Sequence, residues 1–402
     1  MPSGSPAFPQ PPSGRPVRVL VSAGEASGDL YAAALVGALR RLQPEMEFFG
    51  CAGPRMQAAG VEPVVDAASL SVVGIVEVAA HIPRIYREFR RLIRAARERR
   101  PTLAILTDSP DFHLRLAPRL RAAGIPVVYL VAPQVWAWRR GRLKTMRRNI
   151  SRLLCIFPFE EEFFGRNGVR AAYIGHPLTR LARPSCSKAA FLEKHRLDPD
   201  RPLIALLPGS RPGEIARHLP IVADAVRHME GQGGGHFLLA LPAGLRNRTG
   251  ERFFAEPIGG APIQIIEGET WDAIAHAELA LAASGTVTME AALLGTPMVT
   301  FYKVTPLTWW LGRPFVNVPY FSMVNLVAGK RIVPELIQNE MTAENLANSG
   351  VSLLRDPAAR SRMKQELDGL VQRLATTRDP MENAAAAVME LIEDVSNVQR
   401  GC

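Results

Sequence analysis

The stretch LIALLPGSR, residues 203–211, indicates the fold class of the second half of the chain. Its five apolar residues, 203–207, suit a strand that is buried on both faces of a sheet. Gly209, Ser210 and Arg211 then form a turn from which a helix begins, and the free N–H groups of a helix start favour an anion. An arginine at this place can neutralise a pyrophosphate. The alternative is a surface arginine beside a structural turn.

The same alternation of short apolar runs and helical stretches recurs along the chain and is typical of parallel sheets covered by helices. A first series of predicted strands comprises residues 17–23, 103–107, 127–131, 153–157 and 171–174. A second comprises residues 203–207, 236–241, 263–267, 279–283 and 298–302. We therefore predict two α/β domains that meet near residues 175–177. Ligands bind at the carboxyl ends of such strands, so we expect the chemistry in an interdomain cleft.

Composition limits the class of protein. The 402 residues suit two domains, and 47% hydrophobic residues can form two cores. The net charge of +10 fits nucleic acid, an anionic membrane or a phosphorylated substrate. The cysteines 51, 155, 186 and 402 form no CxxC pair, which argues against a disulfide framework or a zinc site and fits a reducing cytosol. No run of eighteen apolar residues predicts a membrane span.

A second turn suited to phosphate follows the predicted strand at 279–283. Ser284, Gly285 and Thr286 are small, so backbone N–H groups there can approach an anion. Glu290 lies about one turn into the following helix, where its carboxylate can accept hydrogen bonds from ribose hydroxyls. A capped helix with a solvated glutamate is the alternative. Two such turns in one domain favour a nucleotide site.

Asp108 is the candidate catalytic base, because it directly follows the predicted strand at 103–107. A structural turn aspartate is the alternative. Asp111 precedes a helix and is interpreted as its N-cap. The turn GEASGD, residues 24–29, lacks the GxGxxG spacing, and it fits a phosphate turn and a capped helix start equally well. The DxD pattern at residues 198–200 precedes a strand, so we interpret it as a turn and predict no metal.

Residues 70–100 combine an apolar patch with a basic stripe. Apolar side chains at helical spacing include Ile75, Val76, Val78, Ile82 and Ile85, and Arg84, Arg87, Arg91 and Arg94 flank them. This pattern suits an anionic membrane surface or an acyl-chain substrate. The alternative is an amphipathic helix packed on the first sheet, which we expect for part of the stripe.

In this order, the motifs of the chain resemble those of lipid-A-disaccharide synthases. They are GEASGD (24–29), AGPRMQAAG (52–60), VVGIVEV (72–78), DSPDF (108–112), APQVWAW (132–138), IGHP (174–177), LLPGSR (206–211), LAASGTVTMEA (281–291) and FSMVNLVAG (321–329). The resemblance covers about residues 17–395. One departure is Ser109 after Asp108, where alanine is expected.

The resemblance implies a GT-B fold, with two Rossmann-like parallel-sheet domains facing across an interdomain cleft. It implies transfer of 2,3-diacylglucosamine from UDP to the 6-hydroxyl of 2,3-diacylglucosamine 1-phosphate, with inversion and without a cofactor. Asp108 would be the base. The donor residues would be Gly209, Ser210, Arg211, Ser284, Gly285, Thr286, Glu290 and Asn325. Ser27, Gly28 and His176 would lie at the acceptor or between the domains.

The implied domain plan has four parts. They are a disordered Pro/Ser/Gly-rich tail (1–16), an acceptor- and membrane-facing domain (17–178), a UDP-sugar-binding domain (179–380) and a C-terminal helix (381–402) that can pack back on the first domain. We expect a cytoplasmic protein on the inner face of the inner membrane of a Gram-negative bacterium. Its partners would be the two sugar lipids and the anionic membrane surface, without nucleic acid, and a homodimer is left open.

Three rival functions remain at this stage. A UDP-N-acetylglucosamine 2-epimerase would need additional acids in the cleft and no lipid-facing patch. A MurG-like transferase would share the fold. A non-catalytic, membrane-bound nucleotide-sugar sensor would keep LLPGSR and SGTVTME but would not need Asp108, so the presence of Asp108 favours catalysis.

Overall fold

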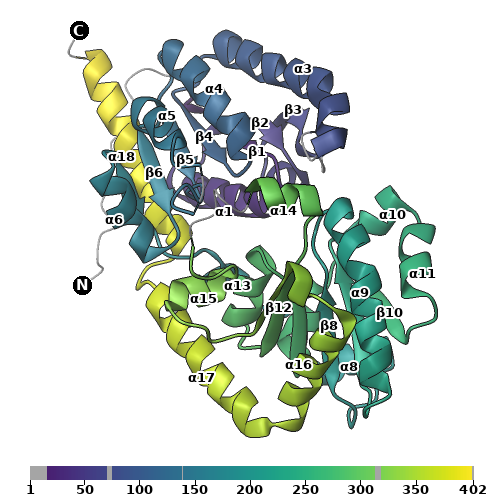
Figure 1. Cartoon of the computed structure of the whole chain (residues 1–402). Helices are drawn as coiled ribbons and strands as arrows, with labels where there is room; N and C mark the ends of the chain where they lie inside the picture. The colour runs from purple at the N-terminus through teal and green to yellow at the C-terminus, as the bar shows by residue number, and fades with distance from the viewer. Residues whose placement is uncertain (1–15, 70–74, 138, 313–317, 401–402) are drawn as a thin grey trace. The chain divides into compact units, whose positions relative to one another are not determined.

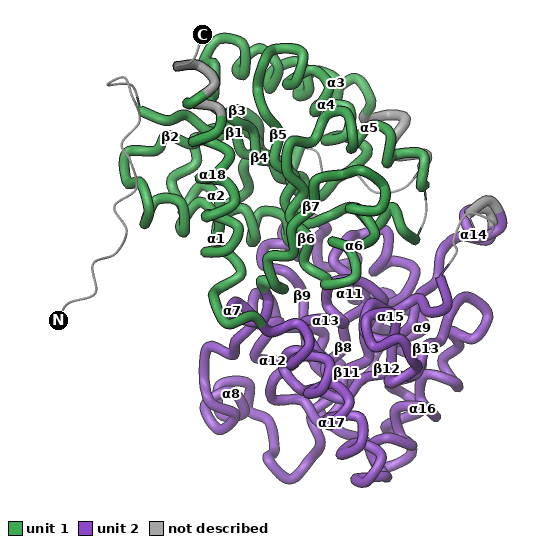
Figure 2. Tube along the Cα trace, turned by 90° about the vertical axis from the view of Figure 1, so that its left-hand side faces the viewer, with its two compact units in different colours: residues 1–177, 376–402 green, residues 178–375 purple. Residues whose placement is uncertain are grey.

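The computed structural model (Figure 1) describes residues 16–69, 75–137, 139–312 and 318–400. The chain divides into two compact units (Figure 2). Unit 1 comprises Met1–Pro177 and Thr376–Cys402, and unit 2 comprises Leu178–Ala375. The predicted tail, apart from Pro16, lies outside the described residues, as do residues 70–74 of the apolar patch.

Unit 1 is built on a seven-stranded parallel sheet with the order β3-β2-β1-β4-β5-β6-β7. Its strands are β1 (Arg18–Ala23), β2 (Glu47–Ala52), β3 (Glu62–Asp66), β4 (Leu103–Thr107), β5 (Val127–Leu130), β6 (Arg152–Cys155) and β7 (Ala171–Tyr173). Its α-helices are α1 (Ala26–Leu42), α2 (Pro54–Ala58), α3 (Ile75–Arg99), α4 (Pro110–Ala122), α5 (Arg142–Asn149), α6 (Pro158–Arg166) and α18 (Pro380–Arg400).

Unit 2 is built on a six-stranded parallel sheet with the order β10-β9-β8-β11-β12-β13. The strands are β8 (Leu203–Leu207), β9 (His236–Leu241), β10 (Ile263–Glu267), β11 (Leu279–Ala283), β12 (Met298–Tyr302) and β13 (Glu335–Ile337). The helices are α7 (Leu178–Leu181), α8 (Lys188–His195), α9 (Pro212–Glu230), α10 (Leu245–Thr249), α11 (Arg252–Ile258), α12 (Thr270–His276), α13 (Thr286–Leu293), α14 (Pro306–Gly312), α15 (Met323–Ala328), α16 (Ala343–Arg355) and α17 (Pro357–Leu374).

The strand order of each sheet reverses once, and this reversal positions the motifs. In unit 1 the chain runs outward from β1 to β3 and then returns to the other side of β1 with β4. In unit 2 it does the same at β8 and β11. The loops after the two strands at such a switch point diverge and leave a crevice for ligands. The motifs GEASGD and DSPDF follow β1 and β4, and LPGSR and SGT follow β8 and β11.

The central strands are apolar because both faces of each sheet are covered. Every residue of β4, β5, β8 and β11 is buried. Continuous apolar runs are what a parallel sheet between two helix layers requires. Three strands, β2, β3 and β13, were not predicted, because they lack a continuous apolar run. β2 ends in the small residues Gly50, Cys51 and Ala52, β3 contains Pro63 at the sheet edge, and β13 has three residues.

The C-terminal helix α18 belongs to unit 1, where it packs against α1. Ala384, Ala385 and Val388 form its buried face, and the Asn383 side-chain amide donates to the carbonyl of Ile174 at 3.0 Å. The chain re-enters unit 1 at Thr376, five residues before the boundary expected from sequence. Within the part of the chain that the structure describes, none of the helices combines the length and the apolar character needed to cross a bilayer.

Candidate active site

Asp108 lies at the switch point of unit 1, against the turn that follows β1. Its Oδ1 accepts the N–H of Gly24 at 2.8 Å, and its Oδ2 accepts the N–H of Glu25 at 3.0 Å. The side chain is 12% exposed. The neighbouring strands β1 and β4 bring the turn and the carboxylate together, since Ala23 pairs with Thr107 at their ends. The carboxylate is therefore oriented by two backbone donors that the sheet holds in place.

The backbone of Asp108 is itself constrained. Asp108 and Ser109 have φ values of +54° and +36°, a region that asparagine and aspartate tolerate better than other side chains. The carbonyl oxygen of Asp108 accepts the hydroxyl of Tyr129 at 2.5 Å and Nδ1–H of His113 at 2.9 Å. A carbonyl only accepts, so His113 carries its proton on Nδ1 and accepts the Ser22 hydroxyl at Nε2, at 2.8 Å. His113 is explained from sequence only as a residue of the following helix, and Tyr129 escaped the sequence analysis.

Burial is the main cause of the shift in the pKa of Asp108. Desolvation, followed by the negative charge of Glu25, raises the pKa of Asp108 to about 8, although the two N–H donors act in the opposite direction. Burial also lowers the pKa of His113 to about 4, so the imidazole is neutral at physiological pH. A carboxyl group with a pKa near neutrality can take up a proton and release it again, as a general base must.

Asp111 has a different role from the expected N-cap. Ser109 occupies the N-cap position of α4, and Asp111 lies within the first turn. Its exposed carboxylate forms ion pairs with Arg139, at 2.8 Å, and with Arg142. The charges of Arg142 and Asp111 act on the Tyr129 hydroxyl together with that of Asp108. The charge of Arg142 therefore reaches the Tyr129 hydroxyl, which bonds to the carbonyl of Asp108.

The structure places the last residues of the GEASGD motif in the first turn of α1 and buries the histidine of the IGHP motif. The helix α1 begins at Ala26, so Ser27 and Gly28 lie in its first turn. The buried Asp29 accepts the N–H groups of Arg55 at 2.9 Å and Met56 at 3.1 Å, which caps α2. His176 is 1% exposed, and burial lowers its pKa to about 3.

In unit 2 the LPGSR turn opens helix α9. Gly209 has a φ of +132°, and a Cβ atom there would lie 2.9 Å from the Cβ of Glu214, so the turn requires glycine. Arg211 is the N-cap residue of α9, and its side chain is 44% exposed. The buried His218 bonds to the carbonyl of Pro208 at 2.6 Å and thereby fixes the turn. The exposed guanidinium and the helix start lie at the same end of β8.

The SGT turn lies beside this one, because β8 and β11 are neighbours. Gly285 and Thr286 are exposed at the start of α13, while the Ser284 hydroxyl donates to the carbonyl of Phe321 at 2.8 Å. Glu290 is half-buried and accepts the indole N–H of Trp271 at 2.8 Å. Trp271, which sequence reasoning missed, thus orients the carboxylate assigned to the ribose.

Asn325 supports the neighbouring loop from inside. It is 0% exposed, and its amide oxygen accepts the N–H groups of Ile332 and Val333 at 2.7 and 2.9 Å. Its amide nitrogen donates to the carbonyl of Val333 at 2.9 Å and to Glu335 at 2.8 Å. These four bonds occupy the whole side-chain amide. This geometry corrects the expectation that Asn325 contacts the donor directly.

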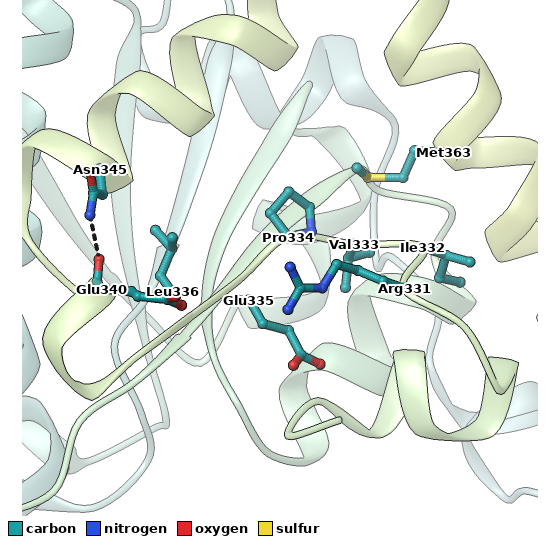
Figure 3. Close-up of a pocket in the computed structure, with 9 residues that line it drawn as sticks. All are labelled: Arg331, Ile332, Val333, Pro334, Glu335, Leu336, Glu340, Asn345 and Met363. Atoms are coloured by element: carbon teal, nitrogen blue, oxygen red, sulfur yellow. Dashed lines mark hydrogen bonds between the residues drawn. The ribbon is translucent and has the colours of Figure 1, made fainter. Parts of the chain in front are cut away.

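Two further features lie outside the motifs. The carboxylate of Asp198 accepts the N–H of Asp200 at 3.0 Å, so the DxD pattern forms a turn. A pocket of about 590 Å³ lies beside β13 (Figure 3), lined by residues 331–336 with Glu340, Asn345 and Met363. Among the described residues that sequence assigns to the donor, none lines this pocket.

The helix α3 is amphipathic, and the structure divides its apolar face in two. Leu92, Ala95 and Ala96 are buried, and α3 contacts β2, β3 and α4. The C-terminal part of α3 therefore packs against the first sheet, as the alternative interpretation of this stretch predicts. Ile82 is 56% exposed and Ile85 is half-buried. The side chains of Ile75, Val76 and Val78 lie outside the described residues.

Comparison with known proteins identifies the family. A family model described as lipid-A-disaccharide synthetase matches residues 19–389. This chain belongs to that family. A lipid-A-disaccharide synthase of Solibacter usitatus (strain Ellin6076) is 58% identical over 376 residues, 94% of this chain and 98% of the relative. One of Myxococcus xanthus (strain DK1622) is 44% identical over 379 residues, again 94% and 98% of the two chains.

Solved structures show that this member of the lipid-A-disaccharide synthetase family has the GT-B fold. The calicheamicin glycosyltransferase CalG4 has a TM-score of 0.57 at 16% identity, covering 94% of this chain and 99% of its own. A UDP-GlcNAc 2-epimerase from Neisseria meningitidis has a TM-score of 0.63 at 12% identity, covering 94% and 100%. Transferases and epimerases share this fold, so the fold leaves the rivals open, and membership of the family favours the transferase.

Proposed function

We propose that this chain transfers 2,3-diacylglucosamine from UDP-2,3-diacylglucosamine to the 6-hydroxyl of 2,3-diacylglucosamine 1-phosphate, forming lipid A disaccharide 1-phosphate and UDP. Membership of the lipid-A-disaccharide synthetase family supports the reaction. The observation that carries the mechanism is the Asp108 carboxylate, held by two backbone N–H groups at a switch point and with a pKa near neutrality. Mass spectrometry of the product formed from the two purified substrates tests the proposal. A protein that binds the donor without forming the disaccharide would be the sensor instead.

In the proposed mechanism, Asp108 takes the proton of the acceptor 6-hydroxyl as its oxygen attacks the anomeric carbon of the donor. The bond from that carbon to the UDP oxygen breaks, and the configuration inverts because attack and departure occur on opposite faces of the sugar. General base catalysis of this kind contributes roughly 100- to 10,000-fold. The protonated Asp108 then returns its proton to solvent.

The departing UDP would be stabilised from the switch point of unit 2. The guanidinium of Arg211 and the start of α13 at Gly285 and Thr286 place positive charge at neighbouring strand ends. These fixed groups would offset the charge that develops on the pyrophosphate, so the proposed step uses no metal ion or cofactor. Glu290, oriented by Trp271, would accept the ribose hydroxyls.

The acceptor carries its phosphate on C1, across the ring oxygen from C5, the carbon that bears the 6-hydroxymethyl group. Arg139 and Arg142 both pair with Asp111, three residues after Asp108, and the charge of Arg142 also acts on the Tyr129 hydroxyl that bonds to Asp108. A phosphate can accept two guanidinium groups more strongly than the single carboxylate of Asp111 does. We assign this pair to the acceptor phosphate, which fixes the direction in which the sugar lies.

Arg211→Ala should weaken UDP binding roughly ten- to a hundredfold, because a charge-assisted hydrogen bond contributes about 1.5–3 kcal/mol. Calorimetry with UDP measures the change. Arg201→Ala is a matched control, since Arg201 precedes the same strand β8 and has a similar side-chain exposure, 42% against 44%. Equal UDP affinity in the two variants would remove Arg211 from the donor site.

The pH profile follows from the raised pKa of Asp108. Only the ionised carboxylate acts as a base, and its fraction falls tenfold per pH unit below a pKa of about 8. We therefore expect log kcat/KM to rise with a slope near +1 between about pH 6 and pH 8 and then to level off. Initial rates across this range measure it. A flat profile over the whole range would contradict a base with a raised pKa.

The acyl chains of both substrates place the reaction at a membrane, and we assign the exposed part of α3 to the anionic inner-membrane surface on its cytoplasmic face. Ile82 and Tyr86 are 56% and 59% exposed, and Arg84 and Arg87 lie on the same stretch. Apolar side chains flanked by arginines suit the boundary between headgroups and acyl chains.

Replacing Ile82 and Tyr86 by serine should weaken binding to vesicles containing anionic phospholipid at least tenfold, with an unchanged melting temperature. Co-sedimentation and a thermal melt measure the two quantities. Leu42→Ser, at the 38%-exposed end of α1, is the control for the loss of an exposed apolar side chain. A large fall in the melting temperature of the double variant would show that this part of α3 belongs to the core.

A further inference from the structure

Unit 2 brings together three side chains that can bind a metal and that lie far apart in sequence. The ligand atoms of Cys186, Asp272 and His276 all lie within 4.8 Å of one another. Asp272 and His276 are four residues apart on α12, and Cys186 comes from the loop before α8. We propose that this cluster is a structural site for a zinc-like divalent transition metal, separate from the donor residues.

The spacing of two of the three ligand atoms matches tetrahedral coordination. The Sγ of Cys186 lies 3.5 Å from Oδ1 of Asp272. A zinc ion with a sulfur ligand at about 2.3 Å and an oxygen ligand at about 2.0 Å separates these two atoms by about 3.5 Å at the tetrahedral angle. Thiolate, carboxylate and imidazole are also the ligand types that zinc accepts. The sulfur and the oxygen are therefore spaced as such an ion requires.

Groups around the cluster hold the ligands in place, as the surroundings of protein metal sites do. The Nε2–H of His276 donates to the carbonyl of Cys186 at 2.9 Å, and its other ring nitrogen keeps the lone pair that a metal needs. Asp272 is buried. Its Oδ1 accepts the N–H groups of Ser185 and Cys186 at 2.7 and 3.1 Å, and its Oδ2 accepts the Ser185 hydroxyl at 2.9 Å. These bonds fix the orientation of both ligands on α12.

The charge of the three ligands and their exposure to solvent also suit a divalent metal ion. A Cys186 thiolate and an Asp272 carboxylate carry two negative charges, which balance a divalent cation. On binding, the ion replaces the thiol proton that Cys186 donates to Asp272, and that proton passes to solvent. Cys186 and His276 are partly exposed, so an ion can enter and a water molecule can complete the coordination.

The site would tie the segment that opens unit 2 to α12. An ion that binds only the folded chain stabilises it, and here it would join residues 86 and 90 positions apart in sequence. A search of the sequence for paired cysteines would not detect such a site, because its ligands are spread over 90 positions.

The test uses the full-length chain stripped of metal by EDTA and then dialysed. Titration with Co²⁺ should give one equivalent bound, with a near-ultraviolet absorption band from a cobalt–thiolate bond. Zn²⁺ should displace the cobalt and raise the melting temperature. In Cys186→Ser the band should vanish, and in His276→Gln the affinity for Co²⁺ should fall at least tenfold.

Two matched variants serve as controls. His195 packs against the same Phe191 ring as His276 but pairs with Glu269, so His195→Gln should bind cobalt like the wild type. Cys402→Ser removes the terminal thiol and should keep the band. UDP binding by calorimetry verifies that the cluster variants are folded. The absence of a thiolate band, its persistence in Cys186→Ser, or equal affinity in the two histidine variants would overturn the proposal and leave a hydrogen-bonded cluster.

Discussion

Replacing Asp108 by asparagine should lower kcat at least a hundredfold and leave UDP affinity unchanged. Asparagine keeps the shape of the side chain and tolerates the positive φ of +54° at this position, so the backbone should not move. What it loses is the ability to take the proton of the acceptor hydroxyl, which is needed only in the transition state. An interaction of this kind affects kcat and kcat/KM equally.

Turnover at saturating substrates and UDP calorimetry together measure this prediction. Asp198→Asn makes the same chemical change in a surface turn and should leave both quantities as they are. The pH profile offers a second readout, because the rise in kcat/KM towards pH 8 should disappear together with the carboxylate. Near-normal turnover of Asp108→Asn would show that Asp108 is structural, and a tenfold loss of UDP affinity would show that the substitution disturbs more than the base.

The motifs of the candidate site that directly follow a buried strand could be predicted from sequence. The runs at 103–107, 203–207 and 279–283 coincide with β4, β8 and β11, because a strand buried on both faces is apolar throughout. Each motif directly after such a run then lies at the carboxyl edge of its sheet. Glycine and the polar residues beside it signal the turn without knowledge of the fold.

The parts that depend on which strands are neighbours were not predictable. Tyr129 reaches the carbonyl of Asp108 because β5 pairs with β4, and Trp271 reaches Glu290 across 19 positions of sequence. A single sequence contains no signal for either contact. The sequence also does not reveal whether a polar residue of a motif faces a ligand or is buried in the interior. Asn325 lies in a motif that resembles the family, yet its amide bonds only within unit 2 and is closed to solvent.

The role of Asp111 shows how local rules fail when a charge partner is distant. An aspartate just before a predicted helix is usually an N-cap. Here Pro110 begins the helix one residue earlier, and the carboxylate instead pairs with Arg139 and Arg142, about thirty positions later. Asp111 thereby holds both arginines at the start of α4, three residues from the candidate base Asp108, which is the basis for assigning them to the acceptor phosphate.

Gly28→Ala should lower kcat as severely as Asp108→Asn does, although Gly28 takes no part in the chemistry. A Cβ atom on Gly28 would lie 1.6 Å from Oδ2 and 2.6 Å from Cγ of Asp108. The helical backbone of α1 accepts alanine, so the cost arises from this overlap alone. Asp108 cannot retreat easily, because Tyr129 and His113 hold its carbonyl. The carboxylate should therefore turn away from the N–H groups of Gly24 and Glu25.

Overpacking of this kind typically costs about 1–3 kcal/mol of folding stability. Denaturant unfolding and turnover of Gly28→Ala measure the two effects. Gly37→Ala is the matched control on the same helix, since a Cβ atom there would approach no closer than 3.9 Å to the Arg41 side chain. That substitution should stabilise the protein by roughly 0.5–1 kcal/mol, as expected for a glycine in a helix interior, and should leave turnover unchanged.

The decisive comparison places Gly28→Ala in an Asp108→Gly background. Glycine accepts the positive φ of residue 108 and removes the three atoms nearest to the new methyl group, which are Oδ2, Cγ and Cβ of Asp108. In this background the destabilisation by alanine should disappear, and its effect on the residual rate should be small, because the two changes act on one contact. If alanine at position 28 destabilises Asp108→Gly as much as the wild type, the clash lies elsewhere. If Gly28→Ala alone keeps normal turnover, the close packing of Asp108 against α1 is not what positions the base.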